Sequence, residues 1–297
     1  MAVIQMTPRV AVVPGGVNIG VLRNGNGQCV MVDTGLNDSN AKKTLKTIRE
    51  EIGDEVVAIL TTHGHADHFG GNPTVVKRTG ARVYAPAVDE LFLRYPLMQP
   101  VCLFAGADPP ESLRGNFLLA KPGPVDEVIE PGELSIAGID MTIVSLAGHS
   151  PNQVGVLVDG VFFCADVVLP ESILRKYRIP YLFSVTDHLR ALNRAREVEA
   201  TAFVAGHGPV LESLTALIDT NQRLVEQVID AVLDFAKEPV TADEVLTGLL
   251  RRFDAQVEDA PSYYLLHPTA FAFLSHLVGV GAIANEVRGG QSLWRRV

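Results

Sequence analysis

Cysteine is scarce in this sequence, and no run of apolar residues is long enough to cross a membrane. The three thiols, Cys29, Cys102 and Cys164, are odd in number and scattered over 297 residues, so we expect no disulfide framework and a reducing compartment. No stretch approaches the roughly 20 apolar residues of a membrane span. The first residues, MAVIQMTPRVAVVPGG, lack a basic start and an unbroken apolar core. We therefore expect no signal peptide, no membrane partner and a cytoplasmic location.

Positive charge is also in short supply. Lys and Arg total 25 against 34 Asp and Glu, which leaves a net charge of −9 at pH 7. Proteins that bind nucleic acid neutralise its phosphates with clustered Lys and Arg, so this balance argues against nucleic acid as a partner. The remaining composition, 47% hydrophobic and 20% charged, is typical of a globular protein. The length suits one large domain with an appendage.

The first 87 residues alternate between strand and helix signals. Within 10–35, two apolar runs are separated by RNGNG, which predicts a β-hairpin. Residues 39–52 carry apolar side chains at helical spacing, and 72–80 fit a helix that ends in glycine. The apolar runs 56–60 and 81–86 predict buried strands.

Residues 88–125 depart from this pattern. They contain six prolines, with apolar and aromatic side chains between them. Long irregular segments of this kind are often lids over a site, or contacts between subunits that would make the protein a homodimer. Alternatively, the segment packs onto its own domain, and the sequence leaves both interpretations open.

Strand-like runs resume after residue 130, and a helix at about 186–200 precedes the last of them. The segment NQVGVLVDGVFFCAD, which closes on Asp166, repeats the form of VNIGVLRNGNGQCVMVD, which closes on Asp33. This repetition suggests two similar half-sheets that face each other. From about residue 211 the pattern turns helical, so we expect a first domain over 1–210 and a second over 211–297.

Ligand-type side chains follow strand-like runs at four places in the first domain. THGHADH comes directly after the strand at 56–60, AGH follows MTIVSL, CAD ends VFFCAD, and GHG follows TAFVA. Because the carboxyl ends of strands can meet along one edge of a sheet, we expect these side chains to form one site. The candidates are His63, His65, Asp67, His68, His149, Asp166 and His207.

These residue types suit a metal centre. Neutral imidazole and carboxylate bind zinc at about 2.0–2.2 Å. Seven candidates exceed the needs of one four-coordinate ion and suit two ions that share a bridging carboxylate and a water. We therefore predict two zinc ions, with iron or manganese as alternatives. His188, His267 and His276 lack such neighbours and are interpreted as ordinary polar loop residues.

Together, THGHADHFGG, the AGH at His149, the CAD at Asp166 and the GHGP at His207 resemble the metallo-β-lactamase superfamily over about residues 10–210. The resemblance implies an α+β fold, an αββα sandwich of two mixed sheets between helices, as the catalytic domain. It also implies a role for each candidate. The residues matched to the first metal ion are His63, His65 and His149. Those matched to the second are Asp67, His68 and His207. Asp166 would bridge the two ions, and Asp33 would support the metal loop from behind.

Within this family the motifs are most similar to those of glyoxalase II-type thioesterases and of lactonases. The β-lactamases usually lack the bridging Asp, and flavodiiron proteins carry Glu in place of His65. Acyl-homoserine lactonases typically have Tyr three residues after the bridging Asp, where this chain has Leu169, and this difference favours a thioesterase.

We therefore predict a dinuclear metal-dependent hydrolase that acts on a small acyl substrate. A hydroxide activated by the metal ions would attack a thioester or carboxylic ester, with Asp67 and Asp166 as catalytic carboxylates. A lactonase, a phosphodiesterase or ribonuclease, and a non-catalytic binding module are the alternatives.

Residues 211–297 are similar to the winged-helix appendage of some hydrolases of this family, including one that cleaves RNA. Thr241 and Glu244 match a capping box at the start of a helix, and AIANEVRGGQSLW predicts a terminal hairpin. The segment holds seven basic against twelve acidic residues, so we expect no nucleic-acid binding. The aromatic residues expected to shape the substrate entrance or a subunit contact are Tyr263, Tyr264, Phe271 and Phe273.

Overall fold

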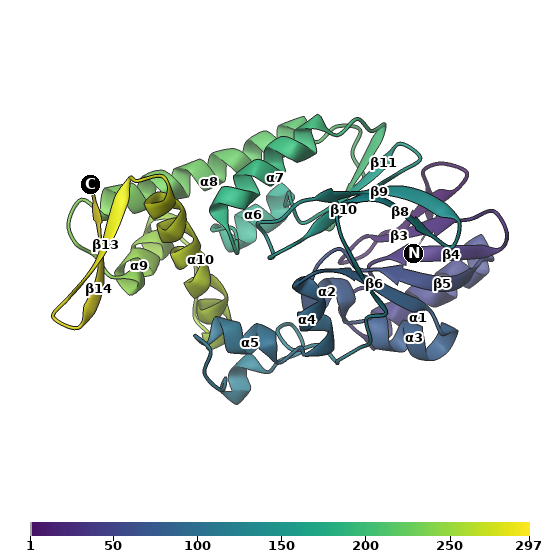
Figure 1. The fold of residues 1–297 in the computed structure, drawn as a ribbon, viewed down its shortest axis with the longest axis horizontal. Helices are drawn as coiled ribbons and strands as arrows, with labels where there is room; N and C mark the ends of the chain where they lie inside the picture. The colour runs from purple at the N-terminus through teal and green to yellow at the C-terminus, as the bar shows by residue number, and fades with distance from the viewer. Residues whose placement is uncertain (1) are drawn as a thin grey trace.

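In the computed structural model, which describes residues 2–297, two β-sheets face each other and helices cover their outer faces (Figure 1). The first sheet is mixed: its first four strands pair antiparallel, and the pairs from the fourth strand onward are parallel. In spatial order its strands are β1 (Ile4–Gln5), β2 (Val10–Val13), β3 (Ile19–Arg23), β4 (Gln28–Val32), β5 (Glu55–Leu60), β6 (Arg82–Pro86) and β7 (Glu127–Ile129).

The second sheet is also mixed. Its first pair of strands is parallel and the other pairs are antiparallel. In spatial order its strands are β12 (Ala202–Ala205), β11 (Val161–Ala165), β10 (Val154–Val158), β9 (Ile139–Ser145) and β8 (Gly132–Ile136).

Apolar side chains from both sheets fill the space between them. Val30 and Val32 of the first sheet belong to one buried cluster with Val156 and Phe163 of the second. Helices bury the outer faces as well, so a central strand such as β11 is buried along its whole length. This two-sided burial explains why VFFCA reads as an unbroken apolar run and does not alternate with polar residues.

Two pairs of helices form the outer layers. α1 (Asp38–Thr47), which continues as a π-helical turn (Ile48–Ile52), and α3 (Asn72–Thr79) pack against the first sheet. α7 (Val185–Glu197) and the first turns of α8 (Thr215–Phe235) pack against the second. The expected αββα sandwich of two mixed sheets is therefore confirmed.

The repetition noticed in the sequence corresponds to two similar hairpins. β3 pairs antiparallel with β4, and β10 pairs antiparallel with β11, each pair lying in the interior of its sheet. Both hairpins end in a left-handed backbone position, with φ of 62° at Asp33 and 47° at Ala165, the residue before Asp166. The two acidic residues thus leave their strands in comparable ways.

Residues 88–125 pack within their own chain. They form α4 (Asp89–Arg94), α5 (Met98–Leu103) and a 3₁₀ turn (Glu111–Leu113), joined by irregular chain. Leu103, Leu113 and Leu118 are buried together against residues of α10 (Ala260–Gly279). The segment therefore packs against the C-terminal helices, and its role as a lid, a subunit contact or a packed excursion stays a prediction.

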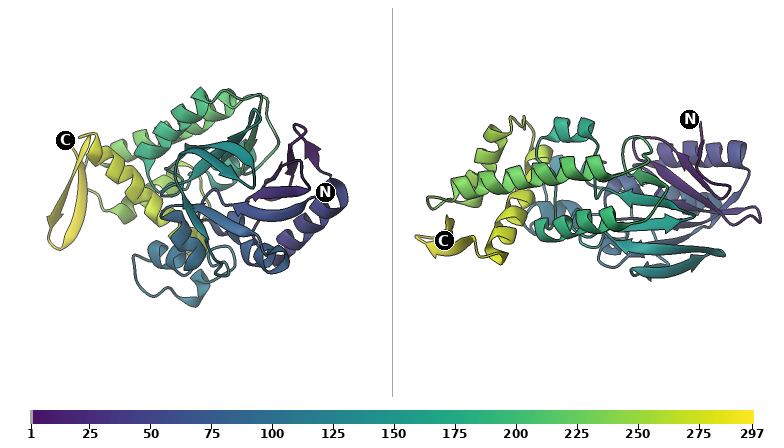
Figure 2. Two further views of the ribbon diagram at one scale, coloured as in Figure 1. Left: turned by 45° about the vertical axis from the view of Figure 1, so that its right-hand side comes forward. Right: turned by 90° about the horizontal axis from the view of Figure 1, so that it is seen from above.

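The C-terminal part is a small helical unit with a terminal hairpin. α8 extends from the sandwich to this unit, where its later turns pack with α9 (Ala242–Arg252) and α10 (Figure 2). The hairpin of β13 (Ile283–Arg288) and β14 (Gln291–Arg296) turns at two glycines, and the Thr241–Glu244 capping box is present. These predicted elements are confirmed. The division of the chain at 210/211 stays a prediction, because α8 contributes to the cores on both sides.

The interpretation of three histidines as loop residues is wrong. His188 lies in α7 and is buried, and its backbone leaves no room for a side chain on Gly148. His267 and His276 lie in α10, where they contact Asp243 and Thr186. The sequence did not indicate that these histidines lie on helices, because a single histidine on a helix face adds nothing to the periodic pattern of apolar residues. Across residues 2–297, no helix is both long and apolar enough to span a bilayer.

Candidate metal centre

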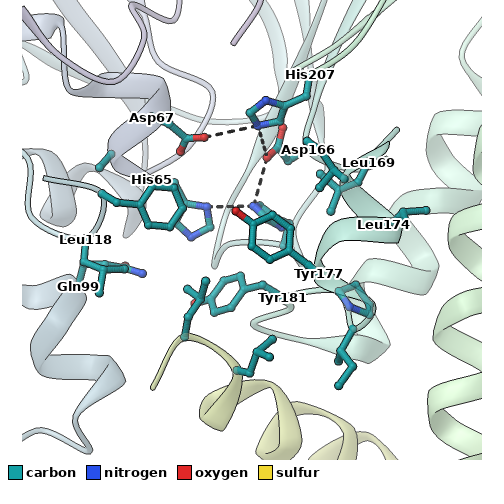
Figure 3. A pocket seen from close by; sticks show the side chains of 18 residues that line it. His65, Asp67, Gln99, Leu118, Asp166, Leu169, Leu174, Tyr177, Tyr181 and His207 are labelled. Atoms are coloured by element: carbon teal, nitrogen blue, oxygen red, sulfur yellow. Dashed lines mark hydrogen bonds and ion pairs between the residues drawn. The ribbon is translucent and has the colours of Figure 1, made fainter. Parts of the chain in front are cut away.

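The seven His and Asp candidates meet where strands of both sheets end. β5 leads into THGHADH, the second half of which is the short helix α2 (Ala66–Phe69). The turns that carry AGH, CAD and GHG follow β9, β11 and β12. The structure thus brings all seven together, although they are far apart in sequence. Figure 3 shows four of them, His65, Asp67, Asp166 and His207, at one end of a pocket.

Three histidines form the first group. The Nδ1 atom of His65 lies 3.0 Å from Nε2 of His63 and 2.9 Å from Nε2 of His149. The ring atoms that face one another all lie within 4.8 Å, close enough to hold one ion. This is the trio that the family resemblance matched to the first metal.

Asp67, His68 and His207 form the second group, and Asp166 lies between the two. Nε2 of His207 is 3.4 Å from Asp67 Oδ2 and 3.4 Å from Asp166 Oδ2. Asp166 also faces Nε2 of His68 at 3.5 Å and Nε2 of His149 at 3.6 Å. One carboxylate therefore touches both groups, as a bridging ligand would.

The first group is in the protonation state that a metal requires. Burial lowers the pKa of His65 to about 4 and that of His149 to about 3, and it lowers the pKa of His63 well below its usual value. Each of these rings is therefore neutral near pH 7 and has a lone pair to donate.

The second group needs positive charge. Burial alone would raise the pKa of Asp166, but His68 and His207 hold it well below its usual value. In return, burial would lower the pKa of His207, but Asp166 and Asp67 raise it to about 10. Nε2 of His68 and Oδ1 of Asp166 are buried without a hydrogen-bond partner. Protons thus supply the charge that a metal ion would supply on displacing them, so the donor set fits a metal.

Neighbouring groups hold these ligands in place. Nδ1 of His68 donates to Asp33 at 2.7 Å, and Asp33 also accepts from the backbone and the hydroxyl of Thr62 at 2.8 Å each. Nδ1 of His207 donates to the carbonyl of Gly16 at 2.6 Å. In both rings Nε2 is left to face the cluster, which fixes the ring orientation that a metal would use.

One supporting residue was not found from the sequence. Asp89, at the start of α4, is completely buried and accepts hydrogen bonds from the backbone N–H groups of Gly64 and Asn152. Burial raises the pKa of Asp89 to about 6, and these donors partly offset that effect. A single Asp inside a proline-rich segment has no motif around it, so nothing in the sequence marked it.

A mostly apolar cavity of about 200 Å³ opens onto the cluster (Figure 3). Gln99, Phe117 and Leu118 of the 88–125 segment form one wall. Tyr181 lies beside the histidines, with its ring centre 5.4 Å from that of His65. Burial raises the pKa of Tyr181 to about 12, so its hydroxyl stays protonated. The other apolar wall residues are Leu169, Ile173, Leu174, Tyr177, Ile179, Pro180, Leu265 and Leu266.

The aromatic residues expected at the substrate entrance or a subunit contact do not line the cavity. Tyr264 packs against Phe104 of the 88–125 segment, behind the cavity wall. Phe273 is completely buried in the core of the helical unit, so the expectation is wrong for this residue. α10 reaches the cavity through the aliphatic Leu265 and Leu266.

Metal-dependent hydrolases built on an αββα sandwich are the class to which this fold and this donor set point. Residues 12–207 match the metallo-beta-lactamase superfamily. Since the match covers most of the chain, the chain belongs to that superfamily, and the resemblance noted in its motifs is confirmed. The superfamily and the donor set together imply a metal cofactor.

Curated relatives include hydrolases of several kinds. The chain is 30% identical to a probable metallo-hydrolase of Bacillus subtilis, over 63% of this chain and 83% of that protein. It is 22% identical to an atrochrysone carboxyl ACP thioesterase of Aspergillus fumigatus, over 94% and 81%. It is also 22% identical to a hydroxyacylglutathione hydrolase of Albidiferax ferrireducens, over 79% and 87%.

The fold of the whole chain also occurs in a solved structure. A metallo-beta-lactamase family protein from Thermus thermophilus superimposes with a TM-score of 0.73 and 22% identity. The superposition covers 97% of this chain and 98% of the other. The C-terminal helical unit is therefore part of a shared architecture.

Proposed function

We propose that the protein is a dinuclear zinc hydrolase that cleaves acyl thioesters, with carboxylic esters as slower substrates. The observation that carries this proposal is the apolar cavity that opens directly onto the His/Asp cluster. A cavity of this lining favours a hydrocarbon acyl group and offers little to a phosphodiester, whose charged backbone would need cations. The thioesterase and hydroxyacylglutathione hydrolase among the relatives support the same bond type.

The two ions would be held by the two groups of side chains described above. His63, His65 and His149 would bind the first ion. Asp67, His68 and His207 would bind the second, with Asp166 between them. When bound, the metals would lower the pKa of a water molecule and polarise the substrate carbonyl.

The chain's own groups supply the remaining chemistry. Asp67 lines the cavity as an ionised carboxylate, because His68 and His207 outweigh the effect of burial and lower its pKa to about 2. It would orient the attacking water and accept a proton from it. The protonated hydroxyl of Tyr181 would orient the acyl carbonyl. Water adds to the carbonyl carbon, the carbon–sulfur bond breaks, and the products are a carboxylic acid and a thiol.

A turnover panel tests the bond type. Metal-replete protein is assayed on butanoyl thioesters, butanoyl oxygen esters, lactones, a β-lactam and a phosphodiester. We expect the thioesters to have the highest kcat/KM. Faster cleavage of a lactone, or of the phosphodiester, would replace this proposal with the corresponding alternative.

Two aspartate variants distinguish hydrolysis by this protein from hydrolysis by a contaminating enzyme. Asp67→Ala should lose activity by a factor of at least about 10², because it removes a ligand and a proton acceptor together. Asp140→Ala removes an exposed carboxylate from β9 and should be as active as the wild type. Equal activity of the two variants would show that the His/Asp cluster is not the active site.

A further inference from the structure

A second groove lies beside the cavity, on the other face of α6 (Glu171–Tyr177). It has a volume of about 380 Å³ and is formed between α6 and the middle of α8. Its lining residues are Glu171, Leu174, Arg175, Arg178, Thr220, Arg223, Leu224, Gln227 and Phe253. The proposed reaction does not use this groove.

The groove is a basic site in an acidic protein. It contains three arginines and one carboxylate, although the chain carries a net charge of −9. Glu171 pairs with Arg175, one turn away on the same helix. Arg178 and Arg223 have no ion-pair partner among residues 2–297. Two guanidinium groups from different elements therefore line the groove with their charge uncompensated.

α6 connects this groove to the cavity. Glu171, Arg175 and Arg178 recur at helical spacing and line the groove, whereas Ile173 and Tyr177 line the cavity. Leu174 borders both spaces. The two sites are thus separated by about one helix width, roughly 10 Å.

The turn after α6 places Arg178 at this junction. Its backbone has φ of 62° and ψ of −34°, a conformation that residues with a side chain rarely adopt. The residues around it, Tyr177 and Ile179, line the cavity, while Arg178 itself lines the groove. A ligand that occupies both spaces would therefore pass this turn.

We propose that the groove binds the phosphate of a phosphopantetheine arm whose thiol carries the acyl group held in the cavity. The proposal rests on the proposed thioesterase function and names its substrate class. Guanidinium groups bind phosphate through paired, charge-assisted hydrogen bonds. Leu224 and Phe253 offer apolar contact to the arm.

The distance between the cavity and the groove favours the phosphopantetheine thiol over other common thiols. The phosphate of a pantetheine arm is about thirteen bonds from the sulfur, which extends to roughly 15 Å. The carboxylates of a small peptide thiol lie six to eight bonds from its sulfur, roughly 7–10 Å when extended, which does not exceed the width of α6. Coenzyme A and acyl carrier proteins both present the longer arm, so the shared chemistry is the phosphorylated pantetheine.

The test compares two substrates that differ only in the phosphate. Butanoyl-pantetheine and butanoyl-4′-phosphopantetheine are assayed with the wild type and with an Arg178→Gln/Arg223→Gln variant. We expect the wild type to have a lower KM for the phosphorylated substrate. The variant should raise that KM about tenfold for each guanidinium removed, with no change for butanoyl-pantetheine. Arg49→Gln/Arg78→Gln, which removes the same charge from exposed sites on the other outer layer, should behave as the wild type.

A binding measurement keeps this inference separate from the proposed function. Calorimetric titration with free 4′-phosphopantetheine needs no hydrolysis, and we expect the groove variant to bind at least tenfold more weakly than the charge control. If no thioester is cleaved, the proposed function fails while the groove is still tested. Equal KM values for the two substrates, or equal binding by the two variants, would overturn this inference.

The source of the arm is resolved by two further substrates. A lower KM for butanoyl-coenzyme A than for butanoyl-4′-phosphopantetheine would show that the protein also binds the nucleotide of coenzyme A. A lower KM for the butanoyl form of an acyl carrier protein would assign the protein carrier. Both results depend on the same two arginines if the inference is correct, and each should be lost in the groove variant.

Discussion

Asp89 accepts a 2.7 Å hydrogen bond from the backbone N–H of Gly64, the residue between His63 and His65. Its other oxygen accepts a 2.7 Å hydrogen bond from Asn152, three residues after His149. One buried carboxylate therefore joins the two loops that carry the first group of histidines. It also anchors the start of the 88–125 segment to the metal centre.

We expect Asp89→Ala to weaken both the fold and the metal site. The substitution leaves the buried N–H of Gly64 and the partly buried N–H of Asn152 without an acceptor. The loss of the first should lower the free energy of unfolding by about 1–3 kcal/mol, and the loss of the second by less. Because the histidine loops lose their common support, metal affinity should fall by about 10- to 100-fold. Denaturant titration measures the first effect and competition with a chelator measures the second.

Asp126 provides the matched control. It accepts a 2.7 Å hydrogen bond from the backbone N–H of Val83, near the start of β6 and away from the metal centre. Asp126→Ala should therefore lower the free energy of unfolding and leave metal affinity unchanged. Wild-type metal affinity in Asp89→Ala would show that the histidine loops hold their positions without it.

Gly206 is required for space at the metal centre. A Cβ atom at this position would collide with Oδ1 of Asp166 and lie 2.9 Å from Cε1 of His68. Because a displaced ligand misplaces the reacting groups, we expect Gly206→Ala to lower kcat/KM by about 10²-fold. Gly279→Ala, at the end of α10, meets no atom within 4 Å and should leave kinetics unchanged. Wild-type rates in Gly206→Ala would mean that Asp166 tolerates the shift.

Metal binding should release protons in a defined number. Near pH 7 the raised pKa values of His68 and His207 keep both rings protonated in the metal-free protein, while the first group is already neutral. Filling both sites should therefore release about two protons, and affinity should rise with pH. Calorimetry in buffers of different ionisation enthalpy counts these protons. His207→Ala should release one fewer, and an unchanged count in that variant would contradict the assignment of the proton to this ring.

Metal content is a separate measurement. We expect elemental analysis to find about two ions per chain, and a chelator to lower the melting temperature, since an ion that binds only the folded state stabilises it. Asp166→Ala should retain at most one ion, because its carboxylate touches both groups. Saturation at one ion in the wild type would exclude the dinuclear site.

The sandwich could be predicted because its signals are local. VFFCA is an unbroken apolar run because both of its faces are buried, and THGHADH concentrates ligand-type residues within a few positions. The capping box at Thr241 and the hairpin turn at Gly289 and Gly290 are likewise local. Each of these features depends on neighbours in the sequence, so the sequence displays it directly.

Tertiary contacts that no sequence motif marks were not predicted. Asp89 acquires its role only when α4 meets the loops of His63 and His149, and Phe273 is buried only once three helices pack together. The arginines of the groove come from α6, the turn after it and α8. Those of α6 and α8 are far apart in the sequence, so their spacing does not indicate that they lie close together. The residues that complete the site therefore emerged only from the structure.

The last prediction concerns nucleic acid. The sequence of the helical unit is similar to a winged-helix appendage, which would ordinarily suggest DNA or RNA, and its hairpin ends in Arg295 and Arg296. Residues 211–297 nevertheless contain seven basic and twelve acidic residues, and nucleic-acid affinity depends on neutralising several phosphates at once. The groove at Arg178 and Arg223 is suited to a single phosphate group.

We therefore expect no binding of short RNA or DNA in an anisotropy titration near physiological salt. The control is Arg295→Gln/Arg296→Gln, which should behave as the wild type. Micromolar binding that weakens with salt and disappears in this variant would assign the hairpin as a nucleic-acid contact. Because charge on an exposed hairpin is screened over roughly 8 Å at physiological ionic strength, such binding would need further cations beside it. The excess of acidic over basic residues in 211–297 opposes such binding, and a nuclease assay on the same oligonucleotides should accordingly show no cleavage above that of the Asp67→Ala variant.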